Sequence, residues 1–517
     1  MPKVIIFCTI VHDSITLFSK QIIKYFVISL KTRKEKKMVK RCLILSLVCV
    51  VLPVVSDVFA QSKRDIEQKY LARPLPQAWE ADTLFLQQQP IEGKWWLELQ
   101  DSQLDSIIGL ALQNNQDLLA AADRIRAAHA TLRIQQGYYY PNLNFSAGWT
   151  KLQNSRQTTK ELIDSPTTNQ QYASGDLSTS WELDVFGSIR NRVKSSKEQF
   201  RATQEEYNAV LVSLTAQVAT AYAQLRTLQQ ELEVAQKNMA SQQAILHITE
   251  VRYNTGLASQ LDVSQAKSVY FSTKASIPSI EAGIRQQINA LAILSGLYPS
   301  DLYPALKETR PIPDYMKIVS IGIPANLLRQ RPDIRNAERS VAAAAASVGA
   351  AKSDYFPKFY LKGSIGFAAR DMDRFFDHNS LTYQVTPTLS WTLFQGRQLT
   401  QATKEAKAVL DENIRQYNQT VLTAVQEVDN AMSSYANAVK QVVALRELVV
   451  QGEITLKLSL DLYKRGLATF QNVLDAQRSL LSYQNSLVSA QGGTLSSLIE
   501  LYRSVGGGWQ IDQNKNE

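Results

Sequence analysis

The sequence has very little of the side chains that carry redox and metal chemistry. Its 517 residues include three cysteines and four histidines. All three cysteines, Cys8, Cys42 and Cys49, lie within the first 60 residues, so the chain beyond that point can form no disulfide of its own. A thiol-free chain suits an oxidising compartment, where stray thiols cross-link. The histidines are scattered, and no two have the spacing of metal ligands: His12, His129, His247 and His378.

Sequence motifs of catalysis are absent as well. No nucleophile elbow and no phosphate-binding loop occurs in the chain. Acidic pairs such as Glu205-Glu206 fall within helical segments, where a charged helix surface accounts for them. We therefore expect a protein that is not an enzyme, with no catalytic residues, no metal site and no cofactor.

The basic charge of the chain is concentrated at its N-terminus. The net charge of +9 comes from 56 basic and 47 acidic residues, and residues 1–60 hold ten of the basic ones against three acidic ones. The remaining chain carries 46 basic and 44 acidic residues, a balance of +2. The most basic stretch, Lys31–Arg41, belongs to this N-terminal region, so the charge gives no reason to expect a nucleic-acid partner.

Residues 1–60 have the pattern of an N-terminal extension followed by a signal peptide. Translation is predicted to start at Met38, whose basic flank precedes an apolar run over Cys42–Val55, with cleavage after Ala60. That run is shorter than the roughly 20 residues that span a bilayer. We expect export without lipidation, because neither nearby cysteine has a lipoprotein cleavage context. The alternative is that residues 1–37 form a genuine N-terminal anchor.

Most of the remaining chain is a duplication. The sequence RYNTGLA at 252–258 returns as LYKRGLA at 462–468, and the spacing from Asp117 to Pro141 returns between Asp333 and Pro357. Two copies of about 200 residues are a duplicated unit rather than a solenoid of short repeats. The predicted segments are an N-terminal periplasmic segment at 61–100, repeat one at 101–297, a linker at 298–325, repeat two at 326–505 and a tail at 506–517.

Each copy combines two strands with two long helices. Strict alternation of apolar and polar residues predicts strands at about 141–152 and 176–186 in repeat one, and at about 357–368 and 383–394 in repeat two. Apolar residues spaced alternately by three and four predict coiled-coil helices. The long helices are expected at about 187–255 and 397–465, and return helices at 258–296 and 468–503.

These elements require partners outside a single chain. Helices of about 100 Å must pack side by side, and four strands are too few to close a barrel. Three chains of four strands each give a 12-stranded barrel, in which Trp149, Trp181 and Trp391 would form an aromatic girdle. The alternative is a soluble sandwich with one buried face.

The order of the elements resembles the TolC-like outer-membrane efflux family. Ile323–Glu338 resembles the signature that opens the second copy, and Tyr463–Gln477 resembles the periplasmic tip. The resemblance covers about residues 95–505. It implies a mixed α/β membrane protein in which a homotrimeric, 12-stranded transmembrane β-barrel continues into a long periplasmic α-helical barrel, with the 298–325 linker in the equatorial region. It also implies an outer-membrane lipid environment, a periplasmic adaptor, and an inner-membrane pump of the resistance-nodulation-division type.

The same resemblance implies roles for residues near the glycine turns. Asp475 matches an acid that narrows the channel mouth, while Asn472 stands where some relatives carry a second acid. The implied sites are a channel gate (Asp475, Asn472, Gln471), closed-state helix links (Tyr463, Asp262, Arg465) and adaptor-docking tips (Gly256, Leu257, Gly466, Leu467). Arg465 is a substitute, because the basic partner of some relatives aligns with Ala468. Spacing alone favours the alternative that Asp475 is a solvated residue on a helix surface.

The sequence therefore predicts the outer-membrane duct of a tripartite efflux system. The alternative is a periplasmic adaptor or a structural coiled-coil protein, which also has long helices. Drugs, metal ions and secreted polypeptides are all compatible substrates.

Overall fold

The computed structural model describes residues 94–153, 169–313 and 330–507, together with Leu71 and the short strands β1 (Leu86–Gln87) and β4 (Val319–Ser320). The chain divides into two units, Met1–Leu71 and Ala72–Glu517, and the architecture below is that of the second. The predicted extension and signal peptide lie outside the described residues, as do parts of the predicted N-terminal segment, the linker and the tail. β1 pairs in parallel with β4, so the segment before repeat one joins the linker before repeat two.

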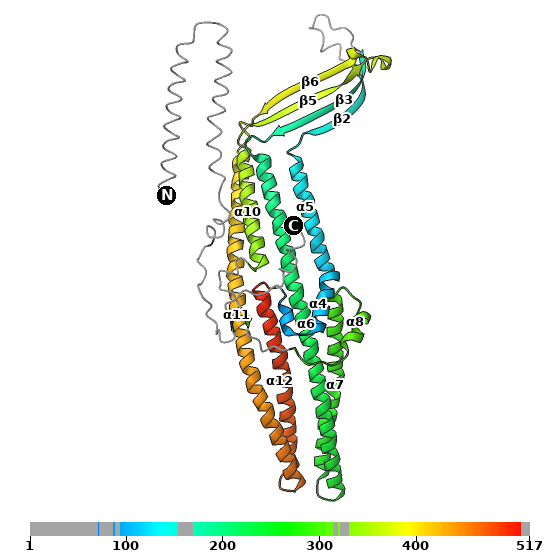
Figure 1. Cartoon of the computed structure of the whole chain (residues 1–517), viewed down its shortest axis with the longest axis vertical. Helices are drawn as coiled ribbons and strands as arrows, with labels where there is room; N and C mark the ends of the chain where they lie inside the picture. Colours follow the sequence, from blue (N-terminus) through cyan, green and yellow to red (C-terminus); the bar gives the residue numbers. More distant parts are fainter. Residues whose placement is uncertain are drawn as a thin grey trace, which may run out of the picture. The chain divides into compact units, whose positions relative to one another are not determined.

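Four helices in two matched pairs form the long axis of this unit. Helices α6 (Ser188–Asn254) and α11 (Gln398–Lys464) have 67 residues each, or about 100 Å. Helices α7 (Gln260–Leu294) and α12 (Phe470–Ser504) have 35 residues each and return along α6 and α11 (Figure 1). Equal lengths in both copies agree with the duplication. Among the described residues, no helix is both long and apolar enough to cross a membrane.

Shorter helices pack alongside the long helices (Figure 1). α4 (Ser102–Asn114) and α5 (Gln116–Gly137) are separated at Asn115, whose side chain accepts a hydrogen bond from the backbone N–H of Leu118 and so caps α5. α5 packs on α6, while α10 (Pro332–Ser353) packs against both α6 and α11.

One antiparallel sheet of four strands stands at the end of the helices opposite the glycine turns (Figure 1). Its strands are β2 (Asn142–Gln153), β3 (Asn169–Leu183), β5 (Lys358–Ala369) and β6 (Leu381–Ser390), in that order. The register sets Phe145 opposite Leu177, Leu177 opposite Ile365, and Ile365 opposite Tyr383. Residues directly opposite share a face, so one face of the sheet is apolar and the other polar.

Two of the four strands end where sequence alternation alone did not place them. β3, predicted at about 176–186, ends at Leu183 because both carboxylate oxygens of Asp184 accept backbone N–H groups at the start of α6. β6, predicted at about 383–394, ends at Ser390, which lies opposite the first residue of β5, so the chain beyond it has no partner strand in this sheet.

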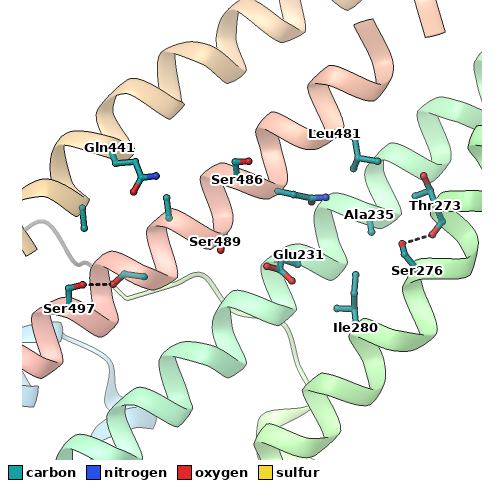
Figure 2. A pocket seen from close by; sticks show the side chains of 14 residues that line it. Glu231, Ala235, Thr273, Ser276, Ile280, Gln441, Leu481, Ser486, Ser489 and Ser497 are labelled. Carbon is teal, nitrogen blue, oxygen red and sulfur yellow. Dashed lines mark hydrogen bonds between the residues drawn. The ribbon is translucent and has the colours of Figure 1, made fainter. Parts of the chain in front are cut away.

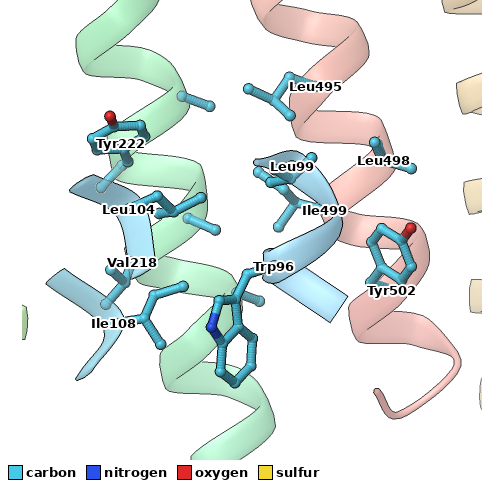
Figure 3. Packing of buried hydrophobic residues seen from close by; sticks show 14 of the residues in the cluster. Trp96, Leu99, Leu104, Ile108, Val218, Tyr222, Leu495, Leu498, Ile499 and Tyr502 are labelled. Carbon is cyan, nitrogen blue, oxygen red and sulfur yellow. The ribbon is translucent and has the colours of Figure 1, made fainter. Parts of the chain in front are cut away.

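An aromatic core holds the middle of the long helices together. The 3-10 helix η1 (Trp95–Leu99), α4 and α8 (Pro299–Leu306) contribute buried residues to a cluster shared with α6 and α12 (Figure 3). Trp95 stacks on Tyr502 with ring centroids 4.9 Å apart, and the Tyr502 hydroxyl donates to Glu98 Oε2 at 2.6 Å. The cluster fixes α12 to the chain segment that precedes repeat one.

A buried arginine adds polar links in the same region. Arg226 is fully buried, and it donates to the Tyr222 hydroxyl at 2.9 Å, to the Glu308 carbonyl at 3.2 Å and to Gln103 Oε1. The Tyr222 hydroxyl donates in turn to Asp101 Oδ2 at 2.6 Å. Burial raises the pKa of Tyr222, so its hydroxyl remains a donor at all physiological pH values. The network joins α6 to α4 and to the segment after α8.

We expect Trp95→Ala to lower the free energy of unfolding by about 3–5 kcal/mol, because it opens a cavity in the aromatic core. The matched control is Leu97→Ala in the same 3-10 helix, where the side chain is 50% exposed. That change should stay within about 0.5 kcal/mol. Guanidinium unfolding followed by far-ultraviolet circular dichroism measures both, and equal midpoints for the two variants would contradict the assignment of this core.

Candidate functional site

The two glycine turns close the ends of the helix pairs in the same way. Gly256 and Gly466 have φ values of +75° and +76°, a conformation that side chains other than glycine rarely adopt. The amide of Leu257 donates to the Arg252 carbonyl, and that of Leu467 donates to the Leu462 carbonyl, as in a Schellman motif. Leu257 and Leu467 are 66% and 73% exposed. The predicted docking tips therefore present an apolar side chain at the end of each pair.

The three predicted gate residues lie together on the first turns of α12. Gln471, Asn472 and Asp475 are exposed, whereas Val473 and Leu474 between them are buried in the tip. Gln471 Nε2 donates to Asp475 Oδ1 at 2.8 Å. This face of α12 consequently exposes one carboxylate and two amide side chains at the surface of the single chain.

The predicted closed-state link residues are not brought together in the single chain. Tyr463 is buried, and its hydroxyl has no hydrogen-bond partner within the described residues. Asp262 accepts the backbone N–H of Ser259 in a capping box at the start of α7. Arg465 forms an exposed ion pair with Asp461 on its own helix at 3.0 Å.

Arg252, which the sequence did not single out, joins the two tips. Its guanidinium lies 4.7 Å from the ring centroid of Tyr463, and Nη1 donates to the Lys464 carbonyl at 2.9 Å. The ring of Tyr463 also packs against Phe470 of α12. The duplication could have drawn attention to Arg252, because the second copy has Leu462 at the equivalent position. The arginine has a role in one tip that its counterpart lacks.

The charged residues that open the second repeat bind neighbouring helices rather than a ligand. Ion pairs connect α10 and its first turn to α6 and α11: Arg331–Glu427 at 2.7 Å, Arg335–Glu205 at 2.6 Å and Arg339–Glu198 at 3.3 Å. Arg331 also donates to the Ser504 carbonyl at the end of α12. Within the described residues, no group of acids, histidines or cysteines is arranged to hold a metal ion. Residues 323–329 of the motif lie outside the described residues.

A polar groove runs between the two helix pairs above the tips. It has a volume of about 770 Å³ and is lined by α6 and α7 on one side and by α11 and α12 on the other (Figure 2). Serine side chains, among them Ser276, Ser486 and Ser489, face it, and Glu231 is its one charged lining residue. Burial raises the pKa of the Glu231 carboxyl. The groove suits a polar protein surface better than an apolar ligand.

The predicted girdle tryptophans occupy two levels of the sheet. Trp181 and Trp391 lie at the helix end, where their indole N–H groups donate to the carbonyls of Tyr139 and Tyr355 at 2.9 and 3.1 Å. These are equivalent bonds in the two copies. Trp149 is 63% exposed and lies toward the far end of β2. Trp391 follows the end of β6, so its predicted place within a strand is wrong.

Comparisons with known proteins agree on one family. Residues 107–297 and 323–507 match the family model described as outer membrane efflux protein. The chain is 33% identical over 418 residues to the solvent efflux pump outer membrane protein SrpC of Pseudomonas putida, covering 80% of this chain and 87% of that one. Among solved structures, it resembles the outer-membrane channel OprN (TM-score 0.78, 30% identity, 85% of this chain and 98% of that one). It also resembles VceC of Vibrio cholerae (TM-score 0.75, 29% identity, 81% and 100%).

We expect Arg252→Ala to loosen the tips, because it removes both the bond to Lys464 and the contact with the Tyr463 ring. Because this bond is exposed to solvent, it contributes about 0.5–1.5 kcal/mol, so amide protection near the two turns should fall about two- to tenfold. Hydrogen–deuterium exchange measures this. Arg465→Ala is the control, since that arginine pairs only within its own helix in the described residues, and equal loss of protection in both variants would contradict the role of Arg252.

Proposed function

The chain belongs to the outer membrane efflux protein family, and on that premise we propose that three copies assemble into one exit duct. The protein is an outer-membrane channel component of an efflux system and extends into the periplasm. Its family consists of transport proteins rather than enzymes. The alternative of a periplasmic adaptor finds no support, because the relatives are outer-membrane proteins.

The observation that carries the trimer is a sheet with two open edges. β2 and β6 each pair with a single strand among the described residues, and both lie at the rim of the sheet. A bilayer cannot hydrogen-bond their free N–H and C=O groups, so strands that span a membrane must close into a barrel. If β6 of each copy pairs with β2 of the next, three copies give 12 strands with no edge left.

The two faces of the sheet support the orientation of such a barrel. Leu143, Phe145 and Tyr383 belong to the apolar face and are 65%, 74% and 79% exposed in the single chain. Lipid outside the barrel would cover them. The opposite face carries Asn144, Ser178 and other small polar residues, which suit a water-filled interior. The apolar side chains proposed to face lipid and the polar side chains proposed to face the lumen therefore lie on opposite faces of the sheet in a single chain.

Below the barrel, the helix pairs would form the wall of a tunnel that narrows at the tips. In a threefold arrangement, the exposed face of α12 would bring three copies of Asp475 to one mouth, with Asn472 and Gln471 beside them. Like charges at close range repel one another and attract cations. The hydrogen bond from Gln471 would hold each carboxylate in place. We assign these residues to the channel gate.

Buried polar groups between α6, α11 and α12 near the tips support an opening movement. The Tyr463 hydroxyl, both polar atoms of the Gln242 side chain and Nε2 of Gln477 are buried without a hydrogen-bond partner in the described chain. Each such buried group without a partner costs about 1–3 kcal/mol. When the helices separate, water can hydrogen-bond to these groups, which offsets part of the free energy that the separation requires. In the proposed closed state, Asp262 and Arg465 would exchange their present partners for links between helices, and the Tyr463 hydroxyl would gain one.

The tips and the groove support docking of the other components. Leu257 and Leu467 at the tips offer apolar contacts, and the serine-lined groove offers hydrogen bonds to a helical adaptor. An inner-membrane pump, of the resistance-nodulation-division type by family resemblance, would select the substrate. The duct itself would contribute a polar passage.

The oligomeric state tests the proposed duct directly. Protein purified from the outer-membrane fraction in detergent should have three times the mass of the processed chain by light scattering, and heating in dodecyl sulfate should convert it to a monomer band. A monomer, or protein recovered in the soluble or inner-membrane fraction, would contradict the duct.

We expect Asp475→Ala to raise single-channel conductance and to lower cation preference, because it removes three carboxylates from the mouth and releases Gln471. Planar-bilayer recordings measure both quantities. Glu453→Ala serves as a control, since it removes an exposed acid from the neighbouring helix α11 at a position outside the proposed gate and helix links. Conductance and selectivity that match the wild type in the Asp475 variant would rule out the gate assignment.

A further inference from the structure

We propose that the segment between β5 and β6, residues 370–380, is a lipid anchor that seats its aromatic side chains among the acyl chains of the outer leaflet. The proposal rests on the proposed function, because it takes the apolar face of the sheet as the face toward lipid. The segment lies at the end of the sheet that is farthest from the helices (Figure 1).

The segment folds back over the apolar face instead of extending away from the strands. Phe375 approaches Gly175 so closely that its Cζ would lie 3.3 Å from a Cβ at that position. Gly175 is opposite Ala147 on one side and Phe367 on the other, which places it on the apolar face. The ring of Phe375 therefore covers part of the surface that we assign to lipid.

Three phenylalanines form a compact group at this place. The rings of Phe375 and Phe376 meet edge to face with centroids 5.0 Å apart, and Phe367 of β5 lies 6.1 Å and 5.6 Å from them. Ser380 is buried, and its hydroxyl donates to the Arg374 carbonyl at 2.8 Å across the segment. The aromatic group is thus fixed to the sheet by defined contacts.

The group nevertheless leaves a large apolar surface uncovered. Phe376, whose ring lies against Phe367 of the apolar face, is 81% exposed, and Met372 of the same segment is 71% exposed. Exposed apolar area that continues a lipid-facing surface favours the same solvent as that surface. Trp149 and Ala369 belong to the last cross-strand row before the segment, since both align with Ala173, so an aromatic rim already exists at this level.

The charged residues of the segment set its depth in the membrane. Arg370, Asp371, Asp373, Arg374 and Asp377 surround the aromatic pair. Charged groups are costly in the hydrocarbon centre and favoured among headgroups, whereas aromatic rings favour the boundary between the two. This combination of aromatic and charged residues points to the boundary between acyl chains and headgroups in the outer leaflet. The rings would face the acyl chains and the charges would lie among the headgroups.

Spin labels at single cysteines test the proposal, because residues 61–517 contain no cysteine. In a full chain with Cys8, Cys42 and Cys49 replaced by serine, Phe376→Cys, Ile365→Cys and Asn379→Cys are labelled separately, and the trimer is reconstituted in phosphatidylcholine vesicles. Collision rates with oxygen report lipid exposure, and those with a water-soluble nickel chelate report water exposure. Phe376 is so exposed that its replacement should leave the fold intact.

We expect the oxygen-to-nickel ratio at position 376 to exceed that at Asn379 several-fold and to lie below that at Ile365, which is deeper on the apolar face. If position 376 matches Asn379 while Ile365 remains lipid-exposed, the anchor is overturned and the duct stands. A label at 376 that neither reagent reaches overturns the anchor too, because the segment would then pack against protein. If Ile365 is itself exposed to water, the proposed barrel orientation fails.

Discussion

Hydrogen bonding along the edges of the four-stranded sheet is the constraint on which the rest of the structure depends. The strands are joined in the order β2, β3, β5, β6, and the two rim strands have free backbone groups on their outer sides. In water such edges are tolerated, but in lipid they are not. In the proposed duct, the apolar face of the sheet would lie against lipid, and the two free edges would then have to pair with other copies of the chain. In that proposal, threefold assembly would set the helix pairs side by side around a common axis.

The packing of the helices is strong at the middle and weaker at the tips. In the middle, Trp95, Tyr502 and the network of Arg226 join α6 and α12 to the chain segments outside the repeats. At the tips, a small cluster around Tyr463 and Phe470 is accompanied by polar groups that lack partners within the described chain. This distribution would suit the proposed tunnel, because the middle would hold its shape while the tips separate.

The two copies are alike where they support the fold and differ where the channel would act. Both have helices of 67 and 35 residues, the same glycine turn and the same tryptophan-to-carbonyl bond. After the first turn, however, Asp262 caps its own helix, whereas Asn472 stands at the equivalent position after the second. The acid of the second copy, Asp475, comes one turn later, on an exposed face. The acid of the first tip therefore caps its own helix, whereas the acid of the second tip stays exposed.

The sequence by itself determined the duplication, the position of every long helix, the two faces of the strands and the glycine turns. These features repeat along the chain with periods of two or three to four residues, or depend on one residue that accepts a positive φ, so they can be read locally. Only the tertiary structure decided where β3 and β6 end, because Asp184 turns to cap α6 and the partner of β6 begins at Lys358. It also decided that Tyr463 contacts Arg252 rather than Asp262. The contact between Arg252 and Tyr463 joins residues about 210 positions apart, and nothing in the local pattern records which of several nearby side chains will meet once the helices pack.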